Sequence, residues 1–393
     1  MKKIWLFALF FSFSSVVIGK TFSLIHYNIK ELDSKKIEER SPQLLLALDI
    51  IKKYPFDFLS LNELQYDWPG IPYPSLETKG KNLDIIGQYL GLDFFSLFHS
   101  GNTGKRAKKR DDGLYWPNLK SLKARRFADP INFGIFPGQY GLGSLFKYPL
   151  KKKRIISELK WRDFDPSVRL ENYRDAFGNR LSKDMLLFDK AFIHGVLDVK
   201  GQDLHFVLLH SVPAYNFGNP RSVNIKRNAA QLKFLEWFLT GKTNEVLGGI
   251  NPLPRGTPFI AVGDFNVDYR DKNKEGAFVM RSLLKKVSMV GPLSHTYEGP
   301  GFEKKPRTML LDYILYGGGL SIKNFAVHGT VSQRKELGCL GPEVNPPSTA
   351  DGKVLLHKLK GRKKCYFEVN KNYFDAKSAS DHFLIWAKFD LDT

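Results

Sequence analysis

Two polar residues that follow a short apolar run are the first candidates for chemistry in this chain. Asp264 and Asn266, in the string GDFNVD, come directly after the apolar residues 259–262. A carboxylate held rigidly at the end of a buried strand can take a proton from water beside a phosphate, and a nearby amide can donate to a phosphate oxygen. An Asp–Asn pair after a strand is also common as a simple turn. The string alone leaves both interpretations open.

Two histidines lie at the ends of further apolar runs. His382, in SDH, follows Asp381 and precedes the apolar residues 383–389. Asp312, in LDY, lies inside another apolar run, where an unpaired carboxylate would be costly but could fix the tautomer of an imidazole. His210, in LLHSVP, is either a second imidazole facing a phosphate or a satisfied core histidine. A surface Asp–His pair and a capped Asp312 are the alternatives for the other two motifs.

Two oxygen-bearing side chains could hold a metal ion. Glu63 ends the apolar run in LSLNEL, and Asn28 ends the run in IHYNI. One or two such ligands, with water and substrate phosphate supplying the others, are typical of a magnesium site. An acidic residue at a helix N-terminus and a turn cap are the alternatives.

Short runs rich in Val, Ile, Leu and Phe, bounded by Gly, Asp, Asn or Pro, predict the strands that position these residues. The runs cover residues 22–27, 58–61, 143–146, 192–199, 205–210, 259–262, 309–315 and 383–389. Helices are predicted over 42–53, 81–90 and, by its apolar face, 224–240. We expect loops over the basic segments 105–113 and 147–154 and from 317 to 378. The sequence has no internal repeat and no clear linker between two domains.

Composition and charge limit the classes of protein. The 393 residues are 42% hydrophobic and 25% charged, which excludes a disordered or low-complexity chain. Lys and Arg number 60 against 40 Asp and Glu, a net charge of +20. Such an excess favours a polyanionic partner, such as nucleic acid or an anionic membrane face, although it can also serve solubility alone.

Residues 1–19 have the features of a cleaved signal peptide. Lys2 and Lys3 precede the apolar residues 4–13, and the small residues Val17 and Gly19 fit a cut after Gly19. The apolar run is too short to span a membrane, and no transmembrane segment follows it. We therefore expect a secreted or periplasmic protein whose one large domain, with loop insertions, covers residues 20–393.

The two cysteines, Cys339 and Cys365, are too few for a Cys₄ zinc module. Export would allow them to form a disulfide, since oxidising compartments permit one. Two unpaired, buried thiols are the alternative.

Taken in order, these motifs resemble the endonuclease/exonuclease/phosphatase superfamily. This superfamily includes pancreatic-type deoxyribonucleases, abasic-site endonucleases, bacterial sphingomyelinases and inositol-polyphosphate 5-phosphatases. GDFN and the final SDH are the most specific pieces, and GLGSLFKYPL at 141–150 is similar to a strand signature of the superfamily. The preceding INFGIFPGQYG is similar to a secreted bacterial branch. The resemblance covers residues 21–390, nearly the whole mature chain.

The resemblance implies an α/β (α+β) fold, a four-layer α/β/β/α sandwich of two mixed β-sheets with the active site at one rim. It also implies phosphoester hydrolysis, by a phosphodiesterase or nuclease, through in-line attack of water with Mg²⁺ or Mn²⁺. In this sequence it assigns metal binding to Glu63, with Asn28 and Asp381 close by. The catalytic residues it implies are Asp264 as base, Asn266 on a phosphate oxygen, Asp312 paired with His382, and His210 as the second imidazole.

Three positions depart from the pattern of the superfamily. Asn62 precedes Glu63 where Gln is usual, and Lys147 replaces an Arg in GLGSLFKYPL. In deoxyribonuclease-like members a second Glu, shortly before this strand, supports the first catalytic histidine. Here that place reads Gln139–Tyr140, so the sequence identifies no support for His210.

The substrate is open between several classes. A nucleic acid suits the charge and the basic residues 105–110, with Arg125 and Arg126 nearby. A phospholipid headgroup suits secretion and the triplet 114–116, Leu-Tyr-Trp, which could rest at a membrane interface or simply pack under a loop. A small phosphoester is the third option, and a secreted binding protein without turnover is the fourth. We expect a monomer.

Overall fold

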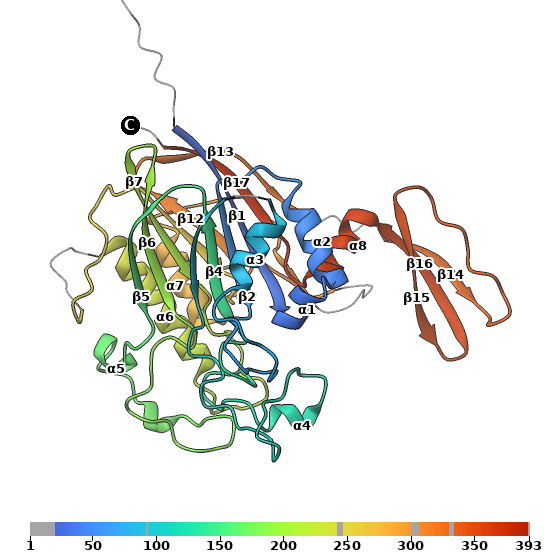
Figure 1. The fold of residues 1–393 in the computed structure, drawn as a ribbon, viewed down its shortest axis with the longest axis horizontal. Helices are drawn as coiled ribbons and strands as arrows, with labels where there is room; N and C mark the ends of the chain where they lie inside the picture. The colour runs from blue at the N-terminus through green and yellow to red at the C-terminus, as the bar shows by residue number, and fades with distance from the viewer. Residues whose placement is uncertain (1–19, 92, 242–246, 300–305, 330–333, 392–393) are drawn as a thin grey trace, which may run out of the picture.

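The computed structural model describes residues 20–391 except 92, 242–246, 300–305 and 330–333. The predicted signal peptide, residues 1–19, lies outside the described residues. Two six-stranded sheets form the centre of the molecule (Figure 1). None of the helices described is long and apolar enough to cross a membrane.

The first sheet carries the N- and C-terminal strands side by side. Its order is β13 (Leu320–Val327), β17 (Ile385–Leu391), β1 (Lys20–Leu32), β2 (Phe58–Leu64), β4 (Gly141–Phe146) and β3 (Phe95–His99). β1 and β2 run parallel, and the other neighbours run antiparallel. Residues 22–29 of β1 are all buried, because both faces of this central strand are covered.

The second sheet has the order β5 (Leu150–Ile156), β6 (Phe192–Val199), β7 (Gln202–Leu209), β8 (Phe259–Asp264), β12 (Asp312–Gly317) and β9 (Ser288–Met289). Only β7 and β8 are parallel among these pairs. The prediction of a loop over 147–154 was wrong, because residues 150–156 form β5. β5 lies at the edge of the sheet, where Lys151 to Arg154 point to solvent, and charged side chains are typical of such edges.

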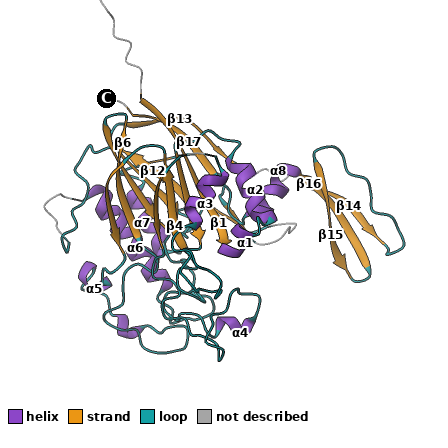
Figure 2. Ribbon diagram, in the orientation of Figure 1, coloured by secondary structure: helices purple, strands orange, loops and turns teal. Residues whose placement is uncertain are grey.

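Helices cover the outer face of each sheet (Figure 2). α1 (Ser34–Glu38), α2 (Pro42–Ile51), α3 (Asn82–Tyr89) and α8 (Lys371–Ala379) contribute to one apolar cluster with the first sheet. α6 (Asn224–Thr240) and α7 (Glu275–Leu283) contribute to a second cluster with the other sheet. A third cluster fills the space between the sheets. The predicted sandwich of two mixed sheets and outer helices is therefore confirmed.

The segment 317–378 is not a loop, contrary to the prediction. It contains β13, then β14 (Lys335–Leu340), β15 (Lys353–Lys360) and β16 (Lys363–Asn370), and finally α8. We call residues 335–370 the ribbon; its strands pair in the order β14–β16–β15 and project from the body (Figure 1). β14 is largely exposed and half of β16 is buried, but the apolar runs of β15 (354–356) and β16 (365–367) are short and flanked by charged residues, unlike those of the core strands.

Cys339 and Cys365 form a disulfide between directly paired residues of β14 and β16. The alternative of two unpaired thiols is therefore wrong.

Long connections gather at one end of the sandwich (Figure 1). They carry the short elements α4 (Leu122–Arg125), α5 (Trp161–Phe164) and a 3₁₀ turn (Leu170–Asn172). A small pair of strands, β10 (Tyr297–Glu298) and β11 (Thr308–Met309), lies before β12. Residues 105–113 have no helix or strand, as expected from the sequence.

Candidate active site

Strands from both sheets bring the candidate residues to one rim. Asn28 and Glu63 lie near the ends of the parallel neighbours β1 and β2. In the other sheet, Asp264 is the last residue of β8, and the first residue of β12, Asp312, pairs with it directly. His210 follows β7, the parallel neighbour of β8.

Four side chains at the rim surround one carboxylate oxygen of the buried Asp264. Its Oδ2 accepts hydrogen bonds from Asn28 Nδ2 and Asn266 Nδ2, each at 3.1 Å. His210 Nε2 lies 3.5 Å from the same oxygen, and His382 Nε2 lies 3.8 Å from it. The arrangement places one carboxylate between two imidazoles and two amides.

Asp312 orients His382. Its Oδ2 lies 2.7 Å from His382 Nδ1, while its Oδ1 lies 3.3 Å from Nε2 of the buried His26. The hydroxyl of Thr296 accepts hydrogen bonds from the backbone amides of Leu311 and Asp312. His382 therefore presents Nε2, and not Nδ1, toward Asp264.

The pKa values of these groups follow from burial and from each other's charges. Burial raises the pKa of Asp264 to about 8, although the nearby positive charge of His382 opposes the shift. Burial alone would lower the pKa of His382, but the negative charge of Asp312 raises it to about 10. Burial would likewise raise the pKa of Asp312, but His382 and His26 lower it to about 2. The Asp312–His382 pair is therefore held as an ion pair.

Glu63 lies close to Asp264, and its carboxylate oxygens could bind a metal ion. Its Oε1 accepts a hydrogen bond from Asn28 Nδ2 at 3.1 Å, and its Oε2 accepts one from the backbone amide of Glu31 at 3.2 Å. Burial raises the pKa of Glu63. One ligand atom from each of Glu63, His210 and Asp264 lies within 4.8 Å of the others. Carboxylate and amide oxygens are the ligands that suit Mg²⁺ and Mn²⁺, so these residues fit such an ion.

Backbone strain concentrates where these ligands are presented. Lys30, Glu31, Glu63 and Asn266 all have positive φ angles, of 50°, 46°, 63° and 53°. The pairing of β1 with β2 shifts register between Asn28 and Leu32, and that of β2 with β4 shifts between Asn62 and Leu64. Left-handed backbone at residues other than Gly costs about 1–3 kcal/mol each and is typical of functional sites.

Asp381 lies near Glu63 but has a partner of its own. Its Oδ2 forms an ion pair with Lys30 Nζ at 3.0 Å. Its charge contributes to the raised pKa of Glu63. Ser380 fixes the preceding turn, because its hydroxyl donates to Asn28 O at 2.7 Å and accepts from the backbone amide of His382 at 3.1 Å. Asp381 therefore lies near Glu63 with its carboxylate engaged by Lys30, and its predicted place beside a metal ion stays a prediction.

His210 has no hydrogen-bond partner for Nδ1 among the described residues. Burial lowers its pKa well below the usual value, and the positive charge of Lys190 adds to the shift. Gln139 accepts a hydrogen bond from the amide of Ile135, and Tyr140 donates one to Glu31, so both are engaged elsewhere. The departure noted in the sequence is thus a real difference in how His210 is held.

The sequence did not predict several residues that position the catalytic candidates by contacting them within the sandwich. His26 contacts both Asp312 and Ser60, and Asn62 Oδ1 accepts a hydrogen bond from the backbone amide of Asp264 at 2.9 Å. The period of two along a strand was the available signal, since His26 lies two residues before Asn28 and on the same face. Lys190 and Thr296 gave no such signal.

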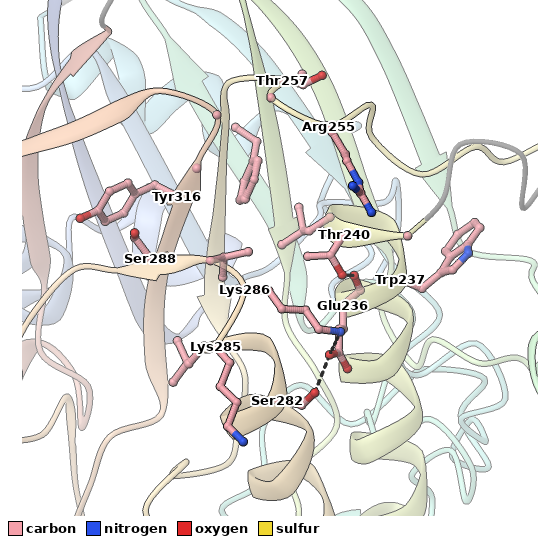
Figure 3. A pocket seen from close by; sticks show the side chains of 18 of the residues that line it. Glu236, Trp237, Thr240, Arg255, Thr257, Ser282, Lys285, Lys286, Ser288 and Tyr316 are labelled. Carbon is pink, nitrogen blue, oxygen red and sulfur yellow. Dashed lines mark hydrogen bonds and ion pairs between the residues drawn. The ribbon is translucent and has the colours of Figure 1, made fainter.

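A broad surface hollow lies away from these residues. It has a volume of about 1210 Å³ and is lined by residues of α6 and by Phe259 and Gly317, at the opposite ends of β8 and β12 from Asp264 and Asp312 (Figure 3). Glu236 accepts hydrogen bonds there from Ser282 and Lys286, each at 2.7 Å. None of the candidate catalytic residues lines this hollow.

Solved structures of other proteins match this chain over most of its length. An endonuclease/exonuclease/phosphatase from Beutenbergia cavernae is 14% identical, with a TM-score of 0.50, over 95% of this chain and 72% of that chain. D. rerio TDP2, complexed with single strand DNA product, is 15% identical, with a TM-score of 0.45, over 94% and 99%. The likeness to the Beutenbergia cavernae protein, at this identity, shows the fold alone. No curated protein matches the chain.

The sequence profile of the Endonuclease/Exonuclease/phosphatase family matches residues 25–382. The match begins in β1, before Asn28, and ends at His382, so it encloses all the candidate site residues. Because it spans most of the chain, the protein belongs to the endonuclease/exonuclease/phosphatase family.

Proposed function

We propose that this protein is a secreted, divalent-metal-dependent phosphoester hydrolase that uses Asp264 as its base. Members of the family are phosphoester hydrolases and generally depend on a divalent metal ion. The observation that carries the proposal is the convergence of His210 Nε2 and His382 Nε2 on Asp264 Oδ2, at 3.5 and 3.8 Å. A basic carboxylate between two imidazole donors suits water attack on a phosphorus atom.

Each residue has a defined part in this chemistry. Asp264, whose pKa burial raises to about 8, takes a proton from the attacking water. His382 stays protonated beside Asp312 and donates from Nε2 to a phosphate oxygen. Glu63 would hold the ion, which when bound supplies charge stabilisation for the phosphoryl oxygens. Asn28 donates from Nδ2 to Glu63 and to Asp264, while its Oδ1 accepts from the amide of Lys30, so it orients the two carboxylates beside the ion. Asn266 donates from Nδ2 to both Ser211 O and Asp264 Oδ2, so it positions the base, and contact with a phosphate oxygen would require one of these bonds to be exchanged.

A polyanionic substrate of the nucleic-acid type has the stronger support. The basic loop 105–110 is tied to the loops beside Glu63, because Gly138 bridges Thr103 and Tyr66 by backbone hydrogen bonds. Tyr115 and Trp116 pack against a small apolar cluster, and each ring also faces a cation, Lys109 or Arg110, at 5.5 Å. Rings engaged in this way are less suited to resting in a membrane interface. We therefore place nucleic acid ahead of a phospholipid headgroup.

A substrate panel tests the proposal. We would incubate the secreted protein with plasmid DNA, RNA, sphingomyelin, phosphatidylcholine and p-nitrophenyl phosphate esters, in Mg²⁺, Mn²⁺ or EDTA. Cleavage of a nucleic acid that EDTA abolishes and Mg²⁺ or Mn²⁺ restores is the expected result. Full activity in chelator would contradict metal dependence, and lipid cleavage alone would overturn the substrate assignment. Binding without turnover of any ester would identify a non-catalytic protein.

Export is part of the same proposal. The N-terminal residues 1–19 have the pattern of a signal peptide, and N-terminal sequencing of the exported protein is expected to begin at Lys20. A mature chain that begins at Met1 would contradict it.

A further inference from the structure

Lys190 is a buried lysine on the His210 side of the rim. The residue is 5% exposed, and its Nζ donates a hydrogen bond to Asp189 Oδ2 at 2.8 Å. A lysine ammonium has three protons to donate, and Asp189 is the one acceptor found for it among the described residues. Burying a charged group is costly unless its remaining donors find partners.

The register of the second sheet places Lys190 beside His210. Phe192, the first residue of β6, pairs with Leu209, the last residue of β7. In an antiparallel pair, the residues just before Phe192 lie alongside the residues just after Leu209. Lys190 and His210 therefore leave the two strands next to each other.

A single side chain joins these two segments beyond the strands. Gln231 Oε1 accepts a hydrogen bond from the backbone amide of Val212 at 2.8 Å. Its Nε2 donates to Asp189 Oδ1 at 2.9 Å and to Leu187 O at 2.9 Å. Because Gln231 is fully buried in α6, it fixes Asp189, and with it the ammonium of Lys190, relative to the strand end that carries His210.

The loop after β3 covers Lys190 from bulk solvent. Gly101 has a φ of 68°, and a Cβ there would lie 2.8 Å from the Cα of Lys190. The amide of Asn102 also donates to the backbone carbonyl of Asp189 at 3.1 Å. Only Gly at residue 101 allows this close approach, so the lysine is enclosed on this side.

Another buried cation nearby is already satisfied. Arg227 donates to the backbone carbonyls of Leu186, Leu187 and Ile131 and to Asn132 Oδ1, at 2.9 to 3.3 Å. The positive charge of Lys190, in contrast, reaches His210 and helps to lower the pKa of that imidazole. Lys190 is thus the cation of this cluster with donors to spare.

We propose that Lys190 is a further catalytic residue, which donates from Nζ to a non-bridging oxygen of the bound phosphate on the His210 side. The inference rests on the proposed function, and it names a contact that the family motifs in this sequence do not include. The Asp189–Gln231 pair would hold the ammonium in position before substrate binds. A purely structural lysine, which only neutralises Asp189, is the competing interpretation.

A charge-neutral double variant separates these two roles. Lys190→Met removes the cation that is hydrogen-bonded to the buried Asp189 and could unfold the protein, so the decisive variant is Asp189→Asn/Lys190→Met, which removes both charges. The matched control is Lys226→Met, which breaks the exposed ion pair of Lys226 with Glu275. We expect the double variant to fold and to lose about 100-fold in kcat/KM, the effect of removing one donor to a developing oxyanion. Turnover like that of the control would overturn the proposal.

Binding of inorganic phosphate tests the contact without catalysis. Calorimetric titration in the presence of Mg²⁺ should show at least about tenfold weaker phosphate binding in the double variant than in wild-type protein or Lys226→Met, about 1.4 kcal/mol. Equal affinity in all three, or no phosphate binding to wild-type protein, would overturn the role of Lys190. If no ester is cleaved but this difference persists, the proposed hydrolysis fails while the phosphate contact stands.

Discussion

At the rim, Asp264 is contacted by residues as distant in sequence as Asn28 and His382, whereas the strands of the ribbon pair only with one another within residues 335–370. The rim consists of buried polar groups held by two sheets. The ribbon is a largely exposed sheet of three strands with a disulfide. Geometry at the rim therefore depends on the whole sandwich, while the ribbon depends on local strand pairing, one disulfide and the packing of Phe367 and Val369 into the apolar cluster of the first sheet.

α8 separates the two regions although it connects them in sequence. Tyr373 donates a hydrogen bond to Glu298 Oε1 at 2.8 Å, and Lys377 Nζ donates to the carbonyls of Glu298 and Gly299, each at 2.8 Å. Tyr373 is also part of the apolar cluster that includes α2. The cluster also includes Phe367 and Val369 of β16, but the hydrogen bonds to Glu298 and Gly299 anchor the helix to the body without the ribbon. We expect changes in the ribbon to stop at α8 and not to reach His382.

The largest effect is expected at the rim. Asp264→Asn and His382→Ala should each lower the rate at least ~100-fold, the size typical of general acid–base groups. Folding should persist, because both side chains lie at the end of a sandwich whose core they do not fill. Measured kcat/KM and circular dichroism would check this, with Asp203→Asn, from an exposed ion pair with Lys151, as control. Wild-type turnover in either variant would show that its assigned role is wrong.

In the ribbon we expect the opposite result, a loss of stability with little change in turnover. Cys339→Ser/Cys365→Ser removes a bridge between residues 26 apart in sequence, and the loop-entropy estimate gives a loss of about 3.5 kcal/mol. Turnover should stay within about twofold of wild type, because α8 is anchored separately. Denaturant unfolding and kcat/KM of the same preparation measure both effects. A tenfold fall in turnover would show that the ribbon and the rim are coupled.

Two glycines with positive φ angles allow us to compare how tightly the backbone is packed in the two regions. Gly104, in the loops at the rim, has a φ of 71°, and a Cβ there would overlap the carbonyl of Phe136. Gly361, in the ribbon turn, has a φ of 62° and open space around it. Gly104→Ala should cost about 2–5 kcal/mol, from left-handed strain and overpacking together, and Gly361→Ala about 1–2 kcal/mol from strain alone. Equal losses in thermal unfolding would contradict the close packing of the rim loops.

The same contrast explains how far the sequence could predict the molecule. Asp264 and His382 were found because strand-end motifs are local strings, and the sandwich followed from the family that those strings resemble. Lys190 was missed because its importance depends on the pairing of Phe192 with Leu209, which no local pattern reveals. β5 and the ribbon were predicted as loops because lysines follow one another in β5 and flank the short apolar runs of β15 and β16. Charged residues thus prevented recognition of β5 and of the strands of the ribbon. The place of Lys190 beside the site could not be predicted, because it depends on strand pairing between distant segments.

The last expected effect, absent at neutral pH, is a pH dependence of stability that arises in the body and not in the ribbon. His194 Nε2 and His205 Nδ1 lie 2.9 Å apart across β6 and β7, and burial, with the charge of His205, lowers the pKa of His194 to about 3. The unfolded chain, with a pKa near 6.5, binds a proton that the folded state excludes, so stability is complete above pH ~6.5 and falls toward pH ~3. One proton gives a slope of at most about 1.4 kcal/mol per pH unit. His194→Gln should flatten the unfolding free energy over this range, while His357→Gln, on the exposed face of β15, should leave the slope unchanged; an equal change in both would place the acid sensitivity elsewhere.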